Sequence, residues 1–278
     1  MANDSPKPDR YAVIGHPVQH SRSPMIHQIF ARQTGENMTY ELLDVEPADF
    51  EVGVRGFGAA GGKGLNVTVP HKPAAFEIST ELGNEAARAR AVNTLSFLPG
   101  GAVRGDNTDG AGFIRDLVTN HGRALAGATV LILGAGGATR GILGPLLDAV
   151  PASVILANRT LENAERLVSE FDSDVALSAC RFEDLVGRDP ADIVINATSA
   201  GVLGESPPFP PECVGRTSFC YDLAYGRNGT PFVAWARKHG AGKAAQGWGM
   251  LVEQAAESFE IWRGPRPDTP SLLAYVSN

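Results

Sequence analysis

The chain of 278 residues has few cysteines and no long apolar run. Its three cysteines, Cys180, Cys213 and Cys220, are an odd number, show no CxxC spacing and follow no secretory leader. This usage is typical of a reducing compartment, so we expect a cytoplasmic protein. No apolar segment approaches the length of a membrane span, which argues against a transmembrane protein.

Positive charge is also scarce. The chain has 24 Lys and Arg residues against 31 Asp and Glu residues, a formal net charge of -7. Without a global positive field, we expect neither nucleic acid nor an anionic membrane as a partner, and a phosphate-bearing ligand would need a local site. His16 and His20 have the spacing of a metal pair only if Pro17 lay inside a helix, so we expect no metal.

Strand-like and helix-like segments alternate almost throughout, which predicts an α/β fold with mainly parallel sheets. Residues 11–15 read as a first strand. Residues 23–35 read as a helix with Ser23 as N-cap, Pro24 in the first turn and Gly35 at the stop. The length suggests two domains.

A second domain, with its own alternation of strands and helices, begins after a loop around residues 122–127. Residues 129–150 read as a buried strand, a glycine turn and a helix, and the last helix, residues 249–262, is expected to pack back on the first domain. We therefore expect one domain of residues 1–108 plus 247–278 and a second, Rossmann-like domain of residues 109–246.

The stretch "VLILGAGGATRG" is the sharpest general signal for a nucleotide site. Gly134, Gly136 and Gly137 follow a buried strand and open a helix, where the backbone can approach a pyrophosphate and the helix dipole favours its charge. The third glycine of the GxGxxG pattern is replaced by Thr139.

The end of the next strand decides between the two nicotinamide nucleotides. NAD sites place an acid there for the ribose, whereas this chain has Asn158, Arg159 and Thr160. Arg159 can bind a 2'-phosphate through charge-assisted hydrogen bonds, which predicts a roughly 10- to 100-fold preference for NADP. The alternative is a solvated arginine at a helix start.

The first domain contains the stretch "LNVTVPHK". Leu65, Val67 and Val69 alternate with Asn66 and Thr68, which predicts a strand with one apolar and one polar face. Lys72 follows this polar edge and can place an ammonium group in a cleft, where Asp109 would hold it. An ordinary surface lysine is the alternative.

Other polar residues of this domain have equally plausible local roles. Ser21 and Ser23 flank an arginine at a helix start, where they could receive a carboxylate, although Ser23 alone reads as a cap. Asn93 in "AVNT" and Asp109 in "DNTDG" could each be turn or cap residues. Only their combination with Lys72 favours an active site.

The ordered set "SRSP", "GGKGLNVTVPHK", "AVNTL", "GDNTDG", "LILGAGGATRG", "NRT", "INATSAG" and "GMLVEQAA" resembles the shikimate dehydrogenase family. The resemblance runs from about residue 11 to about residue 262, and "NVTVPHK" with "DNTDG" is its most specific part. It implies two α/β domains with an active-site cleft between them. It also implies an NADP-dependent oxidoreductase of aromatic amino-acid biosynthesis that interconverts 3-dehydroshikimate and shikimate.

The resemblance also implies roles for matching residues. Lys72 would be the acid/base lysine and Asp109 its partner. The substrate carboxylate would be held by Ser21 and Ser23. The ring hydroxyls would be bound by Thr68, Asn93, Asp109 and Gln254, with Asn66 supporting the pocket and Tyr225 reaching in from the other domain. NADP would be bound by Gly134, Ala135, Gly136, Gly137, Ala138, Asn158, Arg159 and Thr160, and along the nicotinamide by Thr198, Leu223, Gly247 and Met250.

Two departures from the family pattern affect the cofactor side. Gln246 precedes Gly247 where many members have aspartate, and Leu223 stands where some have methionine. Three alternatives remain: an NAD-preferring quinate/shikimate dehydrogenase, a folate-linked methylene dehydrogenase and a non-catalytic NADP sensor. Arg159 and Ser23 argue against the first, and the position of Lys72 after a strand argues against the second. Both a monomer and a homodimer agree with the sequence.

Overall fold

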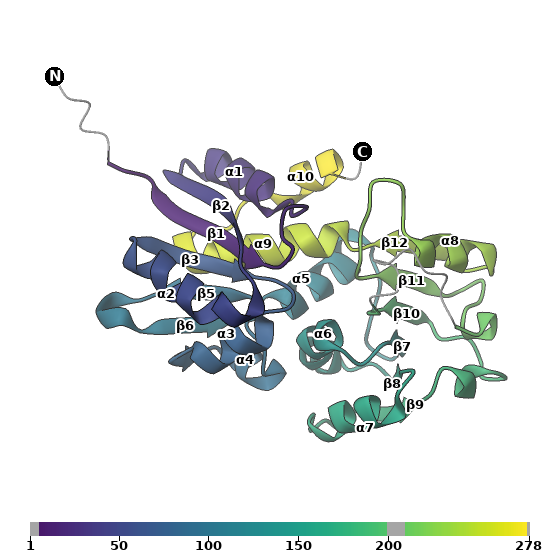
Figure 1. The fold of residues 1–278 in the computed structure, drawn as a ribbon. Coiled ribbons are helices and arrows are strands. Elements are labelled where there is room, and N and C mark those ends of the chain that lie inside the picture. Colours follow the sequence, from purple (N-terminus) through teal and green to yellow (C-terminus); the bar gives the residue numbers. More distant parts are fainter. Residues whose placement is uncertain (1–5, 199–208, 277–278) are drawn as a thin grey trace. The chain divides into compact units, whose positions relative to one another are not determined.

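The computed structural model describes residues 6–198 and 209–276 and divides the chain into two compact units. One unit comprises Met1–Gly112 and Val252–Asn278, and the other comprises Phe113–Leu251. Each unit is built around its own six-stranded sheet, as expected for a two-domain α/β protein (Figure 1). The end of the "INATSAG" motif, residues 199–201, lies outside the described residues.

The sheet of the first unit is mixed. Its strands are β1 (Asp9–Gly15), β2 (Met38–Asp44), β3 (Gly62–Val67), β4 (Glu81–Leu82), β5 (Thr94–Phe97) and β6 (Val103–Asp106). They are ordered β2-β1-β3-β5-β6-β4. β1 is parallel to β2 and β3, whereas β5 is antiparallel to both β3 and β6. The β5–β6 hairpin therefore brings the segment after β6 back to the end of β3.

The helices of the first unit are α1 (Ser23–Thr34), α2 (Phe50–Ala59), α3 (Lys72–Ile78), α4 (Asn84–Ala89) and α10 (Thr269–Val276), with 3₁₀ turns at Pro47–Asp49 and Pro99–Gly101. Gly35 ends α1 in the left-handed region (φ 73°), as predicted. The predicted cap at Ser23 is wrong. Arg22 occupies the cap position, and Ser23 is the first helical residue.

Each of the two boundaries between the units falls inside a helix. These helices are α5 (Asp109–Arg115), which continues as a π-helical turn at Asp116–Asn120, and α9 (Trp248–Arg263). Most of α9 belongs to the first unit. Its buried face includes Val252, Ala255 and Phe259.

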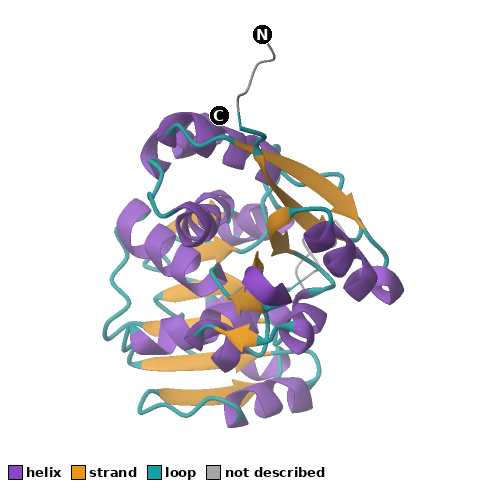
Figure 2. Ribbon diagram, turned by 90° about the vertical axis from the view of Figure 1, so that its left-hand side faces the viewer, coloured by secondary structure: helices purple, strands orange, loops and turns teal. Residues whose placement is uncertain are grey.

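The sheet of the second unit is entirely parallel. Its strands are β7 (Thr129–Leu133), β8 (Ser153–Ala157), β9 (Ala176–Cys180), β10 (Ile193–Asn196), β11 (Phe219–Asp222) and β12 (Lys243–Gln246). The order β12-β11-β10-β7-β8-β9, labelled in Figure 1, is that of a Rossmann fold. Figure 2 shows the strands of this sheet side by side, with helices next to them. Because the strand order reverses between β7 and β10, the carboxyl ends of these two strands mark the expected ligand position.

Helices α6 (Gly137–Asp148), α7 (Leu161–Ser169) and α8 (Pro231–Lys238) belong to this unit, with 3₁₀ turns at Glu183–Leu185 and Pro211–Cys213. Successive residues of β7 enter two different apolar clusters: Ile132 packs in one, and Leu131 and Leu133 pack in the other. Both faces of the sheet are therefore covered, which explains why β7 reads as a continuous apolar run.

The three cysteines are buried and unpaired. Burial raises the pKa of Cys213 and of Cys220 to about 12 and also raises the pKa of Cys180. All three thiols therefore remain protonated at neutral pH. Among the residues that the structure describes, no helix is both long enough and apolar enough to cross a bilayer.

Candidate active site

Lys72 and Asp109 form an ion pair in the first unit. Lys72 is the first residue of α3, and Asp109 is the first residue of α5. The Lys72 ammonium contacts Asp109 Oδ2, and the two side chains are 22% and 8% exposed. The carboxylate is thus buried, whereas the lysine retains access to solvent or to a ligand.

The side-chain amide of Asn93 fixes the other oxygen of this carboxylate. The backbone N–H of Thr108 donates to Asn93 Oδ1 at 2.9 Å, which determines how the amide is oriented. Asn93 Nδ2 therefore faces Asp109 Oδ1, at 2.9 Å, and Gln254 Oε1, at 3.4 Å. Asp109 has one oxygen held by an amide and the other paired with an ammonium group.

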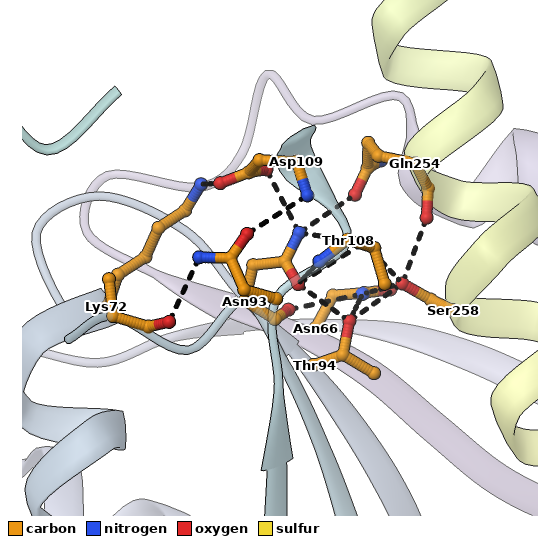
Figure 3. A network of polar contacts seen from close by, with 10 residues as sticks. Asn66, Lys72, Asn93, Thr94, Thr108, Asp109, Gln254 and Ser258 are labelled. Carbon is orange, nitrogen blue, oxygen red and sulfur yellow. Dashed lines mark hydrogen bonds and ion pairs between the residues drawn. The ribbon is translucent and has the colours of Figure 1, made fainter. Parts of the chain in front are cut away.

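Asn66 belongs to the same polar network (Figure 3). Its Nδ2 donates to Ser258 Oγ at 2.9 Å and lies 3.2 Å from Thr94 Oγ1, and Thr94 Oγ1 donates to Asn93 Oδ1 at 2.9 Å. Ser258, on α9, also lies 3.2 Å from Thr108 Oγ1. Strands β3 and β5, helix α9 and the start of α5 therefore position one another's polar groups in this unit.

The two predicted carboxylate-binding serines lie at the start of α1. Ser21 Oγ donates to Ser23 Oγ at 3.2 Å and accepts from the Ser23 backbone N–H at 3.3 Å. Near these serines, Tyr40 on β2 donates from its phenol to Asn66 Oδ1 at 2.7 Å. Burial raises the pKa of Tyr40 well above 10, so its hydroxyl stays protonated.

The alternation predicted for residues 65–69 holds only in part. Leu65 and Val67 are buried as expected, but β3 ends at Val67, and Val69 is 69% exposed. The prediction that Val69 shares the apolar face is therefore wrong, because β3 ends two residues before it. Thr68 is half-buried, and its hydroxyl makes no hydrogen bond with the described residues.

Sequence reasoning missed four members of this network: Tyr40, Thr94, Thr108 and Ser258. Two of them carried a local signal. Thr108 lies inside the "DNTDG" motif, and Ser258 follows Gln254 by four residues, which places both on one face of a helix. Tyr40 had no such signal, because its partners are distant in the sequence.

The glycine turn of the second unit leaves its backbone accessible. Gly134 has φ +106° and lies against Ala197, so a side chain there would be both strained and crowded. A Cβ added at Gly136 or Gly137 would meet no atom within 4 Å. The backbone N–H groups at the start of α6 are therefore open to an anionic group.

Asn158 connects this turn to the end of β8. Its Oδ1 accepts from Ala135 N at 3.2 Å, and its Nδ2 donates to Thr160 O at 2.7 Å. Arg159 is exposed and pairs with no acid among the described residues, and Thr160 is exposed beside it. An available guanidinium next to a glycine turn suits a phosphate ester.

Further residues expected on the cofactor side surround the ends of β10, β11 and β12. Thr198 donates from both N and Oγ1 to Asn196 Oδ1, and Leu223 N donates to Asn196 O. A Cβ on Gly247 would collide with the carbonyl of Leu223. Met250 packs against the apolar cluster of this unit, and the ring of Tyr225 lies 4.4 Å from that of Trp248.

Among residues 6–198 and 209–276, no group of three or more His, Cys, Asp or Glu side chains is placed to hold a metal ion. His16 instead pairs through Nδ1 with Asp44 Oδ1 at 2.7 Å.

The fold and these side chains define a two-sheet α/β protein of the dinucleotide-binding class. Residues 13–95 match the shikimate dehydrogenase substrate binding domain, residues 116–207 match shikimate / quinate 5-dehydrogenase, and residues 247–272 match the shikimate 5'-dehydrogenase C-terminal domain. The chain belongs to the shikimate dehydrogenase family. The resemblance inferred from the motifs is therefore confirmed.

Individual relatives are similar over nearly the whole chain. The shikimate dehydrogenase (NADP(+)) of Alkalilimnicola ehrlichii is 53% identical over 266 residues, which are 96% of this chain and 97% of that protein. The crystal structure of an Ael1 enzyme from Pseudomonas putida is 44% identical, with a TM-score of 0.90 and coverage of 97% and 98%. Shikimate 5-dehydrogenase from Thermus thermophilus, in complex with NADP(H) and shikimate, is 33% identical, with a TM-score of 0.84 and coverage of 96% and 97%.

Proposed function

We propose that the protein is an NADP-dependent oxidoreductase that reversibly reduces 3-dehydroshikimate to shikimate, a reaction of aromatic amino-acid biosynthesis. The observation that carries the proposal is the ion pair between Lys72 and Asp109, whose carboxylate is also held by Asn93. We assign substrate binding and catalysis to residues 1–108 plus 247–278, and NADP binding to residues 109–246. The buried, unpaired cysteines support a cytoplasmic location.

Lys72 would transfer the proton. As the ketone carbon of the substrate accepts a hydride, the ketone oxygen becomes an alkoxide, and Lys72 Nζ donates a proton to it to give the alcohol. In the reverse direction, Lys72 removes the hydroxyl proton. Asp109 holds the ammonium in place and is itself held by Asn93, so little reorganisation is needed during the transfer.

The remaining polar groups of the first unit would bind the substrate. Ser21 and Ser23 would receive its carboxylate, and Thr68, Asn93, Asp109 and Gln254 would bind the ring hydroxyls, with Asn66 supporting them. The unengaged hydroxyl of Thr68 supports its role. Asn66, by contrast, is saturated by protein partners and would act by holding its neighbours.

The second unit would hold NADP, which supplies the hydride when bound. The open backbone at Gly136 and Gly137 fits a pyrophosphate, and the available cation of Arg159 fits a 2'-phosphate. Ala135, Ala138, Asn158 and Thr160 would shape the same turn. Thr198, Leu223, Gly247 and Met250 would lie along the nicotinamide, and Tyr225 would reach the substrate.

The test is the reduction of the nicotinamide nucleotide, followed by the absorbance of its reduced form, with shikimate or quinate and with NADP or NAD. Activity with shikimate and NADP supports the proposal. Strong activity with quinate and NAD would overturn the cofactor assignment and favour a quinate/shikimate dehydrogenase. NADP binding without turnover in any of the four combinations would favour a non-catalytic sensor.

A further inference from the structure

We propose that Gly15 is a positioning residue for Thr68: its missing side chain leaves the space that receives the Thr68 methyl group and thereby fixes the direction of the Thr68 hydroxyl. The inference deepens the proposed function, on which it rests, because it explains how one substrate-binding hydroxyl is oriented. Gly15 lies outside the motifs that carry the family resemblance.

The contact is direct. Gly15 is the last residue of β1 and is buried. A Cβ built on it would overlap Thr68 Cγ2, at a separation too short for any real contact. Gly15 does not have a positive φ, so its backbone conformation is open to alanine. Glycine is therefore required here by space and not by backbone conformation.

The backbone around Thr68 cannot shift easily to relieve such an overlap. Thr68 N donates to Ile14 O at 2.9 Å, directly before Gly15, and His16 N, directly after it, donates to Val69 O at 3.1 Å. His71 N donates to Thr68 O at 2.9 Å. With the main chain tied on both sides, the side chain of Thr68 has to rotate instead.

Rotation of a threonine moves its hydroxyl as well as its methyl. Both groups are attached to the same chiral Cβ, so each staggered rotamer that places the methyl also places the hydroxyl. The space beside Gly15 therefore selects one of three directions for Oγ1. Because this hydroxyl has no polar partner among the described residues, only the packed methyl holds it.

The test compares Gly15→Ala in two backgrounds, the natural chain and Thr68→Ser, which keeps the hydroxyl and removes the methyl. The Kd for shikimate is measured by calorimetry without cofactor, and KM and kcat are measured with NADP. Gly15→Ala alone should raise the Kd and the KM for shikimate by about tenfold, the loss of one hydrogen bond, and leave the KM for NADP unchanged. Thr68→Ser alone should raise the Kd for shikimate by no more than about threefold, because the serine hydroxyl is free to adopt all three staggered rotamers and only one of them is productive.

In the Thr68→Ser background, Gly15→Ala should raise the Kd for shikimate by less than about twofold, because the methyl group that the alanine side chain would overlap is absent. Val18 Cγ2 and Val69 O, each 3.3 Å from the added Cβ, are present in both backgrounds and cancel in the comparison. An equal cost in both backgrounds would overturn the inference.

Folding and function are controlled separately. If Gly15→Ala alone does not fold, recovery of folded protein in the double variant supports the contact, and failure of both variants overturns it. If the natural chain neither binds nor oxidises shikimate, the proposed function fails. Binding by the natural chain together with equal costs in both backgrounds means that only the role of Gly15 fails.

Discussion

The phenol of Tyr221 donates a 2.5 Å hydrogen bond to Asp116 Oδ2, and both side chains are almost completely buried. The second carboxylate oxygen accepts from Asn120 Nδ2 at 2.9 Å. Burial, and then the neighbouring carboxylate, raise the pKa of Tyr221 well above 10, so this donor persists at all ordinary pH values. A buried acid is thus stabilised by two neutral donors, and His121 Nε2 lies 3.6 Å from Asp116 Oδ2.

We predict that Tyr221→Phe lowers the free energy of unfolding by about 1 to 3 kcal/mol, because a buried acceptor loses its partner. Urea unfolding near neutral pH measures this. In Asp116→Asn the carboxylate is absent, so adding Tyr221→Phe to that variant should cost less than it does alone. Equal costs in the two backgrounds would contradict the coupling.

Replacement of Lys72 tests the acid/base assignment. Lys72→Ala should lower kcat by about 10²- to 10⁴-fold, because the alkoxide loses its proton donor, while NADP binding is retained. Lys63→Ala is the matched control: this lysine lies on β3, is exposed, and should leave kcat within about twofold, the usual scatter for a surface change. Full turnover by the Lys72 variant would disprove its role.

Arg159 is expected to select the nucleotide. Arg159→Ser should raise the KM for NADP by roughly 10- to 100-fold and leave the KM for NAD nearly unchanged, since only NADP carries the 2'-phosphate. Arg166→Ser, at an exposed position on α7, should change neither value. Steady-state kinetics with both nucleotides measures these values. If Arg159 is solvated and does not bind the 2'-phosphate, its replacement will affect the KM for NADP and the KM for NAD to the same extent.

His27 should make the free energy of unfolding depend on pH. The ring is fully buried, stacks on Tyr40 at 4.2 Å and has both nitrogens without a hydrogen-bond partner in the described structure. Burial lowers its pKa from 6.5 to about 3. Since the unfolded chain binds a proton at this site more readily than the folded chain, the stability that it contributes falls as the pH drops from 6.5 towards 3.

Replacement by phenylalanine removes this titration. Between about pH 7 and about pH 4.5, we expect the free energy of unfolding of His27→Phe to gain about 2.5 kcal/mol relative to the natural chain, from the factor of about 1.36 kcal/mol per pKa unit. Urea unfolding at the two pH values measures the difference. His239→Phe, whose histidine lies beyond α8, controls for the general acid response. A pH-independent difference would show that His27 is not held neutral.

Local sequence signals predicted helices and strands well where one continuous stretch contains all the residues that determine the element. The β7–glycine–α6 unit is an example, because its apolar run, its turn glycines and its helix start are contiguous. The expected contact of Lys72 with Asp109 is also present, although it was expected from the opposite charges of the two groups and from the family resemblance, and not from spacing. Nothing in their separation of 37 positions specifies a hydrogen bond.

The failures have the opposite cause. Tyr40, Asn66 and Ser258 meet from three elements, and the pair formed by Asn66 and Ser258 is 192 positions apart. Such contacts depend on how strands and helices pack, which no local pattern encodes. The exposure of Val69 likewise depends on where β3 ends. The cap of α1 shifted by one residue, which is the ordinary uncertainty of a helix boundary.

The discontinuous first unit has a consequence for synthesis. Gln254 and Ser258 complete the polar network around Asn66 and Asn93, yet they follow the entire second unit in the chain. A polypeptide made from its amino terminus can form the parallel sheet of the second unit while the first 112 residues still lack these partners. The first unit is therefore the last part to be completed, and a translation product that ends after the second unit lacks the two side chains that bind Asn66 and Asn93.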